Sequence, residues 1–185
     1  MPQKKLRLVF DINLSSVRIN DIDIVVAPQA IQPFDIDAVV EEQDTALILS
    51  EPESITEPEN KPAWFLANKL ESQTLLKPGS VIKRDGKTIR LLAIVHDLDM
   101  EPSWSSEWIK HALDNIIKVC QEQGISSIQL PVLGAQHGRF NIEEFLQLLV
   151  IAINKAQGKL KKIWLVVPQK ECSRTLSYLK KLSKN

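Results

Sequence analysis

The second half of this chain alternates between short apolar runs and longer segments of helical periodicity, which restricts the fold more than any other feature. Apolar runs at residues 88–95, around 128 and at 163–167 are typical of strands. Helical spacing of apolar residues follows each run, ending with an amphipathic helix at 173–183. Such alternation places helices on both faces of a parallel sheet. We therefore expect an α/β protein, a three-layer α/β/α sandwich with a mixed, largely parallel sheet.

Local signals indicate where these elements begin and end. Asp85 and Gly86 form a dipeptide that favours a tight turn, so a hairpin is expected between strands at 81–84 and 88–95. Ser105 or Ser106 can cap the next helix, and Gly124 suits its end. Asn141 is expected to cap a helix at 142–156.

The first half is expected to be rich in strands. Residues 5–14 alternate as a strand does, residues 22–27 are expected to form a second strand, and the segments 38–40 and 45–49 add short apolar runs. A helix is expected to begin at Pro62. Residues 50–62 contain three prolines and four glutamates, which predicts an acidic loop within a single domain spanning residues 1–185.

Composition and charge limit the functions that the protein can have. The 185 residues are 44% hydrophobic and 25% charged, with no apolar run of membrane-spanning length, so a cytoplasmic protein without membrane contact is expected. Lys and Arg residues outnumber Asp and Glu from residue 155 onward, but they suit the solvated face of a helix, and nucleic acid is not an expected partner. Cys120 and Cys172 are expected to be thiols without a role in chemistry.

The segment at residues 124–140, G-I-S-S-I-Q-L-P-V-L-G-A-Q-H-G-R-F, combines an apolar strand with a loop that contains two glycines. Glycines let backbone N–H groups approach an anion closely, and the helix expected after Asn141 points its positive end at this loop. The loop also follows the carboxyl end of a strand, where ligands of parallel sheets usually bind. The sequence therefore predicts a phosphate site here.

These motifs resemble the macrodomain family, whose three-layer α/β/α module binds ADP-ribose and related nucleotides. The resemblance covers roughly residues 45–168: the run D-T-A-L-I-L-S, the segment L-K-P-G-S-V-I-K-R-D-G-K, the strand L-L-A-I-V-H-D, a long helix and the loop. It implies that a glycine-rich loop surrounds the diphosphate and the distal ribose. The residues implied to bind ligand are Gly134, Ala135, Gln136, His137, Gly138 and Arg139.

The chain departs from the family pattern in ways that bear on catalysis. Macrodomain hydrolases carry an asparagine-rich turn after the first matching strand, and that turn is here expected to be residues 50–53, S-E-P-E. An aspartate that meets adenine in the family corresponds to Asp35 or Asp37. Leucine aminopeptidases carry a similar N-terminal domain without catalysis of its own. A degenerate relative without catalytic residues is therefore expected.

Three functions remain open at this point. The first is a module that binds ADP-ribose, a nucleotide or another phosphate-bearing metabolite through the loop, without a cofactor or a metal. The second is an interaction or regulatory domain that keeps the fold and has a protein partner. The third is a hydrolase that uses His137 as a base. A metal centre that includes His96 and Asp97 is disfavoured, because neighbouring strand residues point to opposite faces.

Overall fold

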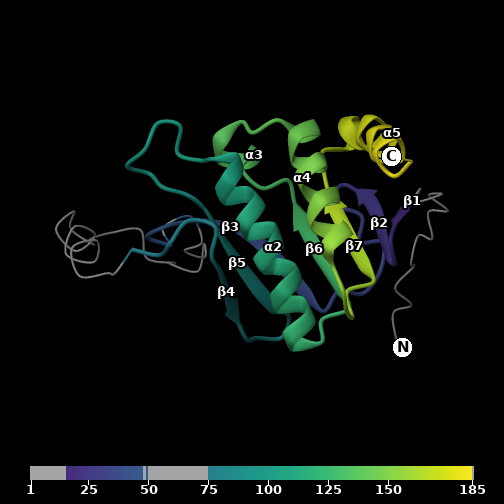
Figure 1. Ribbon diagram of the computed structural model, residues 1–185, viewed down its shortest axis with the longest axis horizontal. Helices are drawn as coiled ribbons and strands as arrows, with labels where there is room; N and C mark the ends of the chain where they lie inside the picture. The colour runs from purple at the N-terminus through teal and green to yellow at the C-terminus, as the bar shows by residue number, and fades with distance from the viewer. Residues whose placement is uncertain (1–15, 48, 50–74, 185) are drawn as a thin grey trace, which may run out of the picture.

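A seven-stranded mixed sheet forms the centre of the molecule (Figure 1). The computed structural model describes residues 16–47, 49 and 75–184. The strand order is β1-β2-β7-β6-β3-β5-β4, in which the five inner strands are parallel to one another and each edge strand is antiparallel to the strand beside it. The strands are β1 (Ser16–Ile19), β2 (Ile22–Ala27), β3 (Ala38–Asp44), β4 (Val81–Arg84), β5 (Ile89–His96), β6 (Ser127–Pro131) and β7 (Lys162–Val166).

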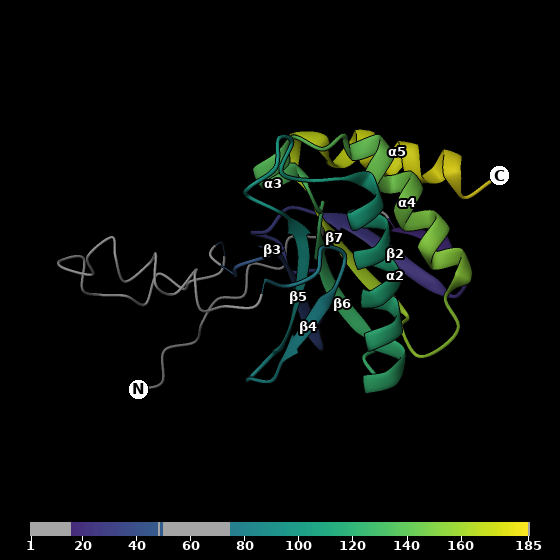
Figure 2. The same ribbon diagram turned by 60° about the vertical axis from the view of Figure 1, so that its left-hand side comes forward.

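Helices α2 (Ser106–Gln123), α4 (Ile142–Lys155) and α5 (Cys172–Leu182) pack on the sheet, with α2 beside α4 (Figure 2). Two short helical segments, α3 (Ala135–Gly138) and η1 (Gln169–Glu171), complete the described elements. The predicted caps are confirmed: the Ser105 side chain accepts the N–H of Glu107, and Asn141 accepts those of Glu143 and Glu144. Gly124 ends α2 in the left-handed conformation.

The hydrophobic core lies between these helices and the face of the sheet to which alternate strand residues point. Leu91, Ala93 and Val95 of β5 belong to this core, as does Cys120 of α2. Burial raises the pKa of the Cys120 thiol to about 12, so the thiolate is not formed near neutral pH. The prediction of a packed thiol is therefore confirmed. Among the described residues, no helix is both long enough and apolar enough to span a membrane.

One predicted strand is wrong. The segment 45–49 was expected to be an extended apolar run, but β3 ends at Asp44 and residues 45–47 form a turn. The cause is the Asp44 carboxylate, which accepts the N–H groups of Ala46 at 2.7 Å and Leu49 at 2.8 Å. A side chain that binds its own backbone in this way competes with strand pairing. The strand at 5–14, the acidic loop at 50–62 and the helix from Pro62 lie outside the described residues.

Asp37 joins two strands at the amino-terminal ends of the parallel strands. Its carboxylate accepts the N–H groups of Ser126 and Ser127 and the Ser126 hydroxyl, all within 3.0 Å. The hydroxyl of Ser126 is the largest cause of a pKa that is lowered from the ordinary aspartate value. These contacts tie the start of β3 to the start of β6.

The lowered pKa of Asp37 predicts a contribution to acid stability. A carboxyl whose folded pKa is below its unfolded pKa stabilises the fold above the unfolded value and loses this effect as pH falls through the folded value. We therefore expect the wild type to lose more stability than Asp37→Asn as pH is lowered from about 5 to about 3. Urea unfolding across this range measures the difference. Asp35→Asn, two residues earlier on the same exposed segment, should keep the wild-type slope.

Candidate functional site

An apolar cavity opens at the carboxyl ends of the parallel strands. It has a volume of about 590 Å³ and is lined by the segments that follow β2, β6 and β7 and by the first residue of α4. Ala135 and Gln136 of α3 line it as well, so two of the six predicted ligand residues border the cavity. Its wall is mostly hydrophobic, with few polar side chains. The lining residues are Pro28, Gln29, Ala30, Pro131, Val132, Ala135, Gln136, Ile142, Val166, Val167 and Pro168.

The predicted loop forms a single helical turn rather than an open coil. Gly134 precedes α3 with φ at 78°, and Arg139 ends it with φ at 56° and an exposed side chain. The Phe140 N–H donates to the Gly134 carbonyl at 2.9 Å, which closes the turn. The side chain of His137 lies outside the described residues. Contact between a ligand and these six residues stays a prediction.

Both glycines of the loop are required by packing within the protein. A Cβ at Gly134 would lie 2.6 Å from Ile109 Cδ1 and 3.0 Å from Phe140 Cβ. A Cβ at Gly138 would overlap the ring of Trp104, which packs edge-on against Phe140 with ring centroids 5.0 Å apart. The sequence suggested that the glycines leave room for an anion, but their Cα atoms face core side chains. Trp104 therefore packs against both Gly138 and Phe140.

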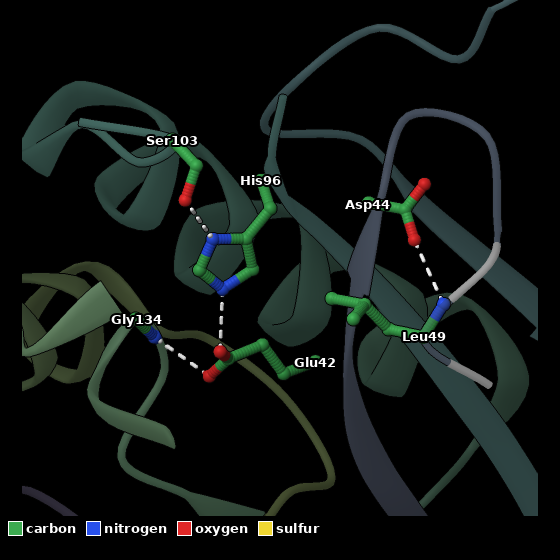
Figure 3. Close-up of polar contacts among 6 residues, drawn as sticks. All are labelled: Glu42, Asp44, Leu49, His96, Ser103 and Gly134. Carbon is green, nitrogen blue, oxygen red and sulfur yellow. Dashed lines mark hydrogen bonds and ion pairs between the residues drawn. The ribbon is translucent and has the colours of Figure 1, made fainter. Parts of the chain in front are cut away.

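A buried carboxylate binds the loop from within (Figure 3). Glu42 Oε2 accepts the Gly134 N–H at 2.7 Å, and Glu42 Oε1 lies 2.5 Å from His96 Nε2. His96 Nδ1 in turn lies 3.1 Å from the Ser103 hydroxyl. The side chains of Glu42 and His96 are 2% and 0% exposed. The chain of contacts thus joins the end of β3, the end of β5 and the loop after β6.

The pair Glu42 and His96 explains why buried polar groups are tolerated at this strand end. A carboxylate that leaves water is costly unless every lone pair facing the protein finds a donor. Here one oxygen accepts a backbone amide and the other meets an imidazole. Hydroxyl, imidazole and carboxylate also occur in this order in nucleophilic catalysis, but the cavity of about 590 Å³ is lined by none of these three residues. Their evident role is to position Gly134.

Other candidates take structural roles or lie elsewhere. Asp35 and Asp37 precede β3 at the amino-terminal edge, so the structure does not place them at the carboxyl edge where the cavity lies. His111 is exposed on α2, as expected. In the described part of the chain, no group of three His, Cys, Asp or Glu side chains is placed to hold a metal.

Sequence reasoning missed Glu42, although a signal for it was present. In β3, Ala38 and Val40 are buried on one face, and alternation places Glu42 on that same face. Glu41 points the other way and pairs with Arg90 of β5. Residues 50–53, which were expected to replace the asparagine-rich turn, lie outside the described residues. The strand β3 ends at Asp44, and the turn after it begins at Thr45.

Comparison with known proteins shows where this architecture occurs. Neither a protein-family model nor a curated protein sequence matches the chain. The macrodomain of Oceanobacillus iheyensis, solved as a mutant with ADPR, has a TM-score of 0.66 to it at 18% identity, over 92% of this chain and 99% of that chain. The chain has a macrodomain-like fold. The predicted fold class, an α/β/α arrangement around a mixed and mostly parallel sheet, is therefore confirmed.

Two further solved structures support the macrodomain-like fold. The macro domain of ganglioside induced differentiation associated protein 2 has a TM-score of 0.61 at 13% identity, over 90% of this chain and 88% of that chain. The macrodomain of Thermus aquaticus DarG has a TM-score of 0.56 at 19% identity, over 78% of this chain and 98% of that chain. At these identities the likeness concerns the fold.

Proposed function

We propose that this macrodomain-like protein binds a nucleotide-like small molecule in the apolar cavity, with the base in the cavity and the phosphate end toward the loop from Gly134 to Arg139. The cavity at the carboxyl edge carries this proposal. Its volume of about 590 Å³ falls within the range of small-molecule sites, roughly 300–1,000 Å³. Ligands of parallel sheets bind at this edge in general.

The surroundings of the cavity suit an amphiphilic ligand. Apolar and proline side chains form most of the wall, which fits the face of a planar base, while Gln29 and Gln136 offer amide groups at its border. Arg139 is exposed at the end of α3 and can supply a positive charge. A similar fold has been solved with ADPR and again with ADP, which supports a ligand of this class.

A larger side chain at the cavity wall should weaken binding. Ala135→Leu places three more carbons at the cavity wall, and we expect the affinity for the best ligand among ADP-ribose, ADP, AMP and adenosine to fall at least about tenfold. Isothermal titration calorimetry measures the change. Ala156→Leu is the matched control, because Ala156 is also half-buried but lines a separate hollow at the other edge of the sheet. Absence of heat with all four ligands, in folded wild type, would contradict the proposal.

A second function, an interaction module without a small-molecule ligand, is favoured by one observation. The Gly134 N–H, the first donor of the predicted phosphate loop, already binds the Glu42 carboxylate. In that case a partner protein should be retained equally by the wild type and by Ala135→Leu. Hydrolysis by His137 remains a third hypothesis, and release of ADP-ribose from a modified substrate that is lost in His137→Ala would support it.

A further inference from the structure

Glu42 places a negative charge directly behind the loop that borders the cavity. Its Oε2 lies 2.7 Å from the Gly134 nitrogen, and the next residue, Ala135, lines the cavity. The carboxylate thus occupies the Gly134 amide from within the protein, so this donor is not offered to a ligand (Figure 3).

Hydrogen-bond roles indicate that Glu42 acts as an acceptor at the loop. A backbone N–H can only donate, so Oε2 accepts from Gly134. When His96 donates from Nε2, the carboxylate is ionised and both of its oxygens have donors. Ser103 faces the other imidazole nitrogen at 3.1 Å and fixes the ring orientation.

The loop cannot easily turn this amide toward a ligand instead. Gly134 has a left-handed φ of 78°, and its Cα faces Ile109 and Phe140 at close range. Phe140 is also fixed by Trp104 and by the hydrogen bond to the Gly134 carbonyl. The Gly134 amide therefore stays bound to Glu42, one residue before the cavity wall at Ala135.

We propose that Glu42 is a specificity-determining residue, which makes the site favour ligands with little negative charge at the loop over ligands with a diphosphate. It occupies one amide donor and repels anions at short range in a buried, weakly screened setting. This inference rests on the proposed function, because it concerns the ligand of the same cavity. It predicts that the preference for adenosine and AMP over ADP and ADP-ribose is stronger with the Glu42 charge than without it.

The test compares Glu42→Gln with Glu41→Gln. Glutamine keeps the size of the side chain and an oxygen that can accept from Gly134, but it removes the charge. Glu41 is the adjacent residue of β3, and its carboxylate pairs with Arg90 on the other face. Calorimetry gives the ratio of the Kd for ADP to the Kd for adenosine in each protein. We expect Glu42→Gln to lower this ratio at least tenfold and Glu41→Gln to change it less than twofold.

The outcomes separate the two proposals. If the wild type binds but the ratio is unchanged in folded Glu42→Gln, the role of Glu42 is overturned and the proposed function stands. If none of the three proteins binds any of the ligands, the proposed function falls and the inference falls with it. If Glu42→Gln does not fold, the ratio is measured in the double variant Glu42→Gln with His96→Leu, which removes the charge together with its partner. A ratio at least tenfold below that of the wild type then supports the inference, and an unchanged ratio overturns it.

Discussion

Gly138→Ala should destabilise the protein by about 3 kcal/mol, which corresponds to a drop in Tm of roughly 6–12 °C for a chain of this size. The new methyl group would overlap the Trp104 ring, which is an inflexible neighbour because Phe140 packs against it. Either the indole must leave its site or α3 must move away from it. Both changes break packing between the loop after β5 and the loop after β6. Thermal unfolding followed by circular dichroism measures the loss.

Gly86→Ala is the matched control for this substitution. Gly86 lies in the hairpin between β4 and β5, and a Cβ there would have its nearest contact with the Thr88 carbonyl oxygen at 3.4 Å. The expected change is within about 0.5 kcal/mol. A Gly138→Ala variant that is as stable as Gly86→Ala would show that the contact with Trp104 does not require glycine.

His96→Leu should cost about 3–5 kcal/mol, because it leaves the buried Glu42 carboxylate with the Gly134 amide as its one hydrogen-bond partner in the described part of the chain. Leucine fills a volume close to that of the imidazole, so the loss reflects the uncompensated charge more than a cavity. Chemical denaturation at pH 7 measures the free energy of unfolding. A loss below about 1 kcal/mol would mean that the pair contributes little to the folded state.

Two further variants test whether the loss of stability in His96→Leu comes from the uncompensated Glu42 charge. His111→Leu changes an exposed histidine on α2 and should stay within about 0.5 kcal/mol of the wild type. The double variant Glu42→Gln with His96→Leu removes the charge together with its partner, and we expect it to recover at least half of the loss. No recovery in the double variant would assign the loss to packing at residue 96.

Much of the fold could be predicted from the sequence because its signals are local. The hairpin between β4 and β5, the caps at Ser105 and Asn141 and the end of α2 at Gly124 each depend on a few adjacent residues. The tight turn expected at Asp85 and Gly86 is wrong, because Arg84 pairs with Arg90 and neither residue of the dipeptide has a positive φ. The end of β3 was missed, since a run of apolar residues after Asp44 looks extended until the aspartate captures the amides of the turn. Here one side chain decided the conformation against the apolar pattern.

The candidate site was harder to predict because its contacts join residues that are far apart in the chain. Glu42 and Gly134 are separated by 92 positions, and Glu42 and His96 by 54. The glycines could be recognised, but the reason for them lies in Trp104, Ile109 and Phe140. The cavity itself is formed by four segments that only the strand order brings together. Such features follow from topology, which a reading of local pattern does not supply.

The strand order has a consequence for the motions of the site. Strands β7, β6 and β3 lie inside the sheet, each hydrogen-bonded on both sides, whereas β1 and β4 are its outer strands. Local opening of a sheet begins at its edges, where the amides are least protected. Amide hydrogen exchange should therefore be fast in β4 and slow at Leu130 and Val40. The contact between Glu42 and Gly134 joins the inner strand β3 to the loop after the inner strand β6, so we expect it to persist when β4 opens.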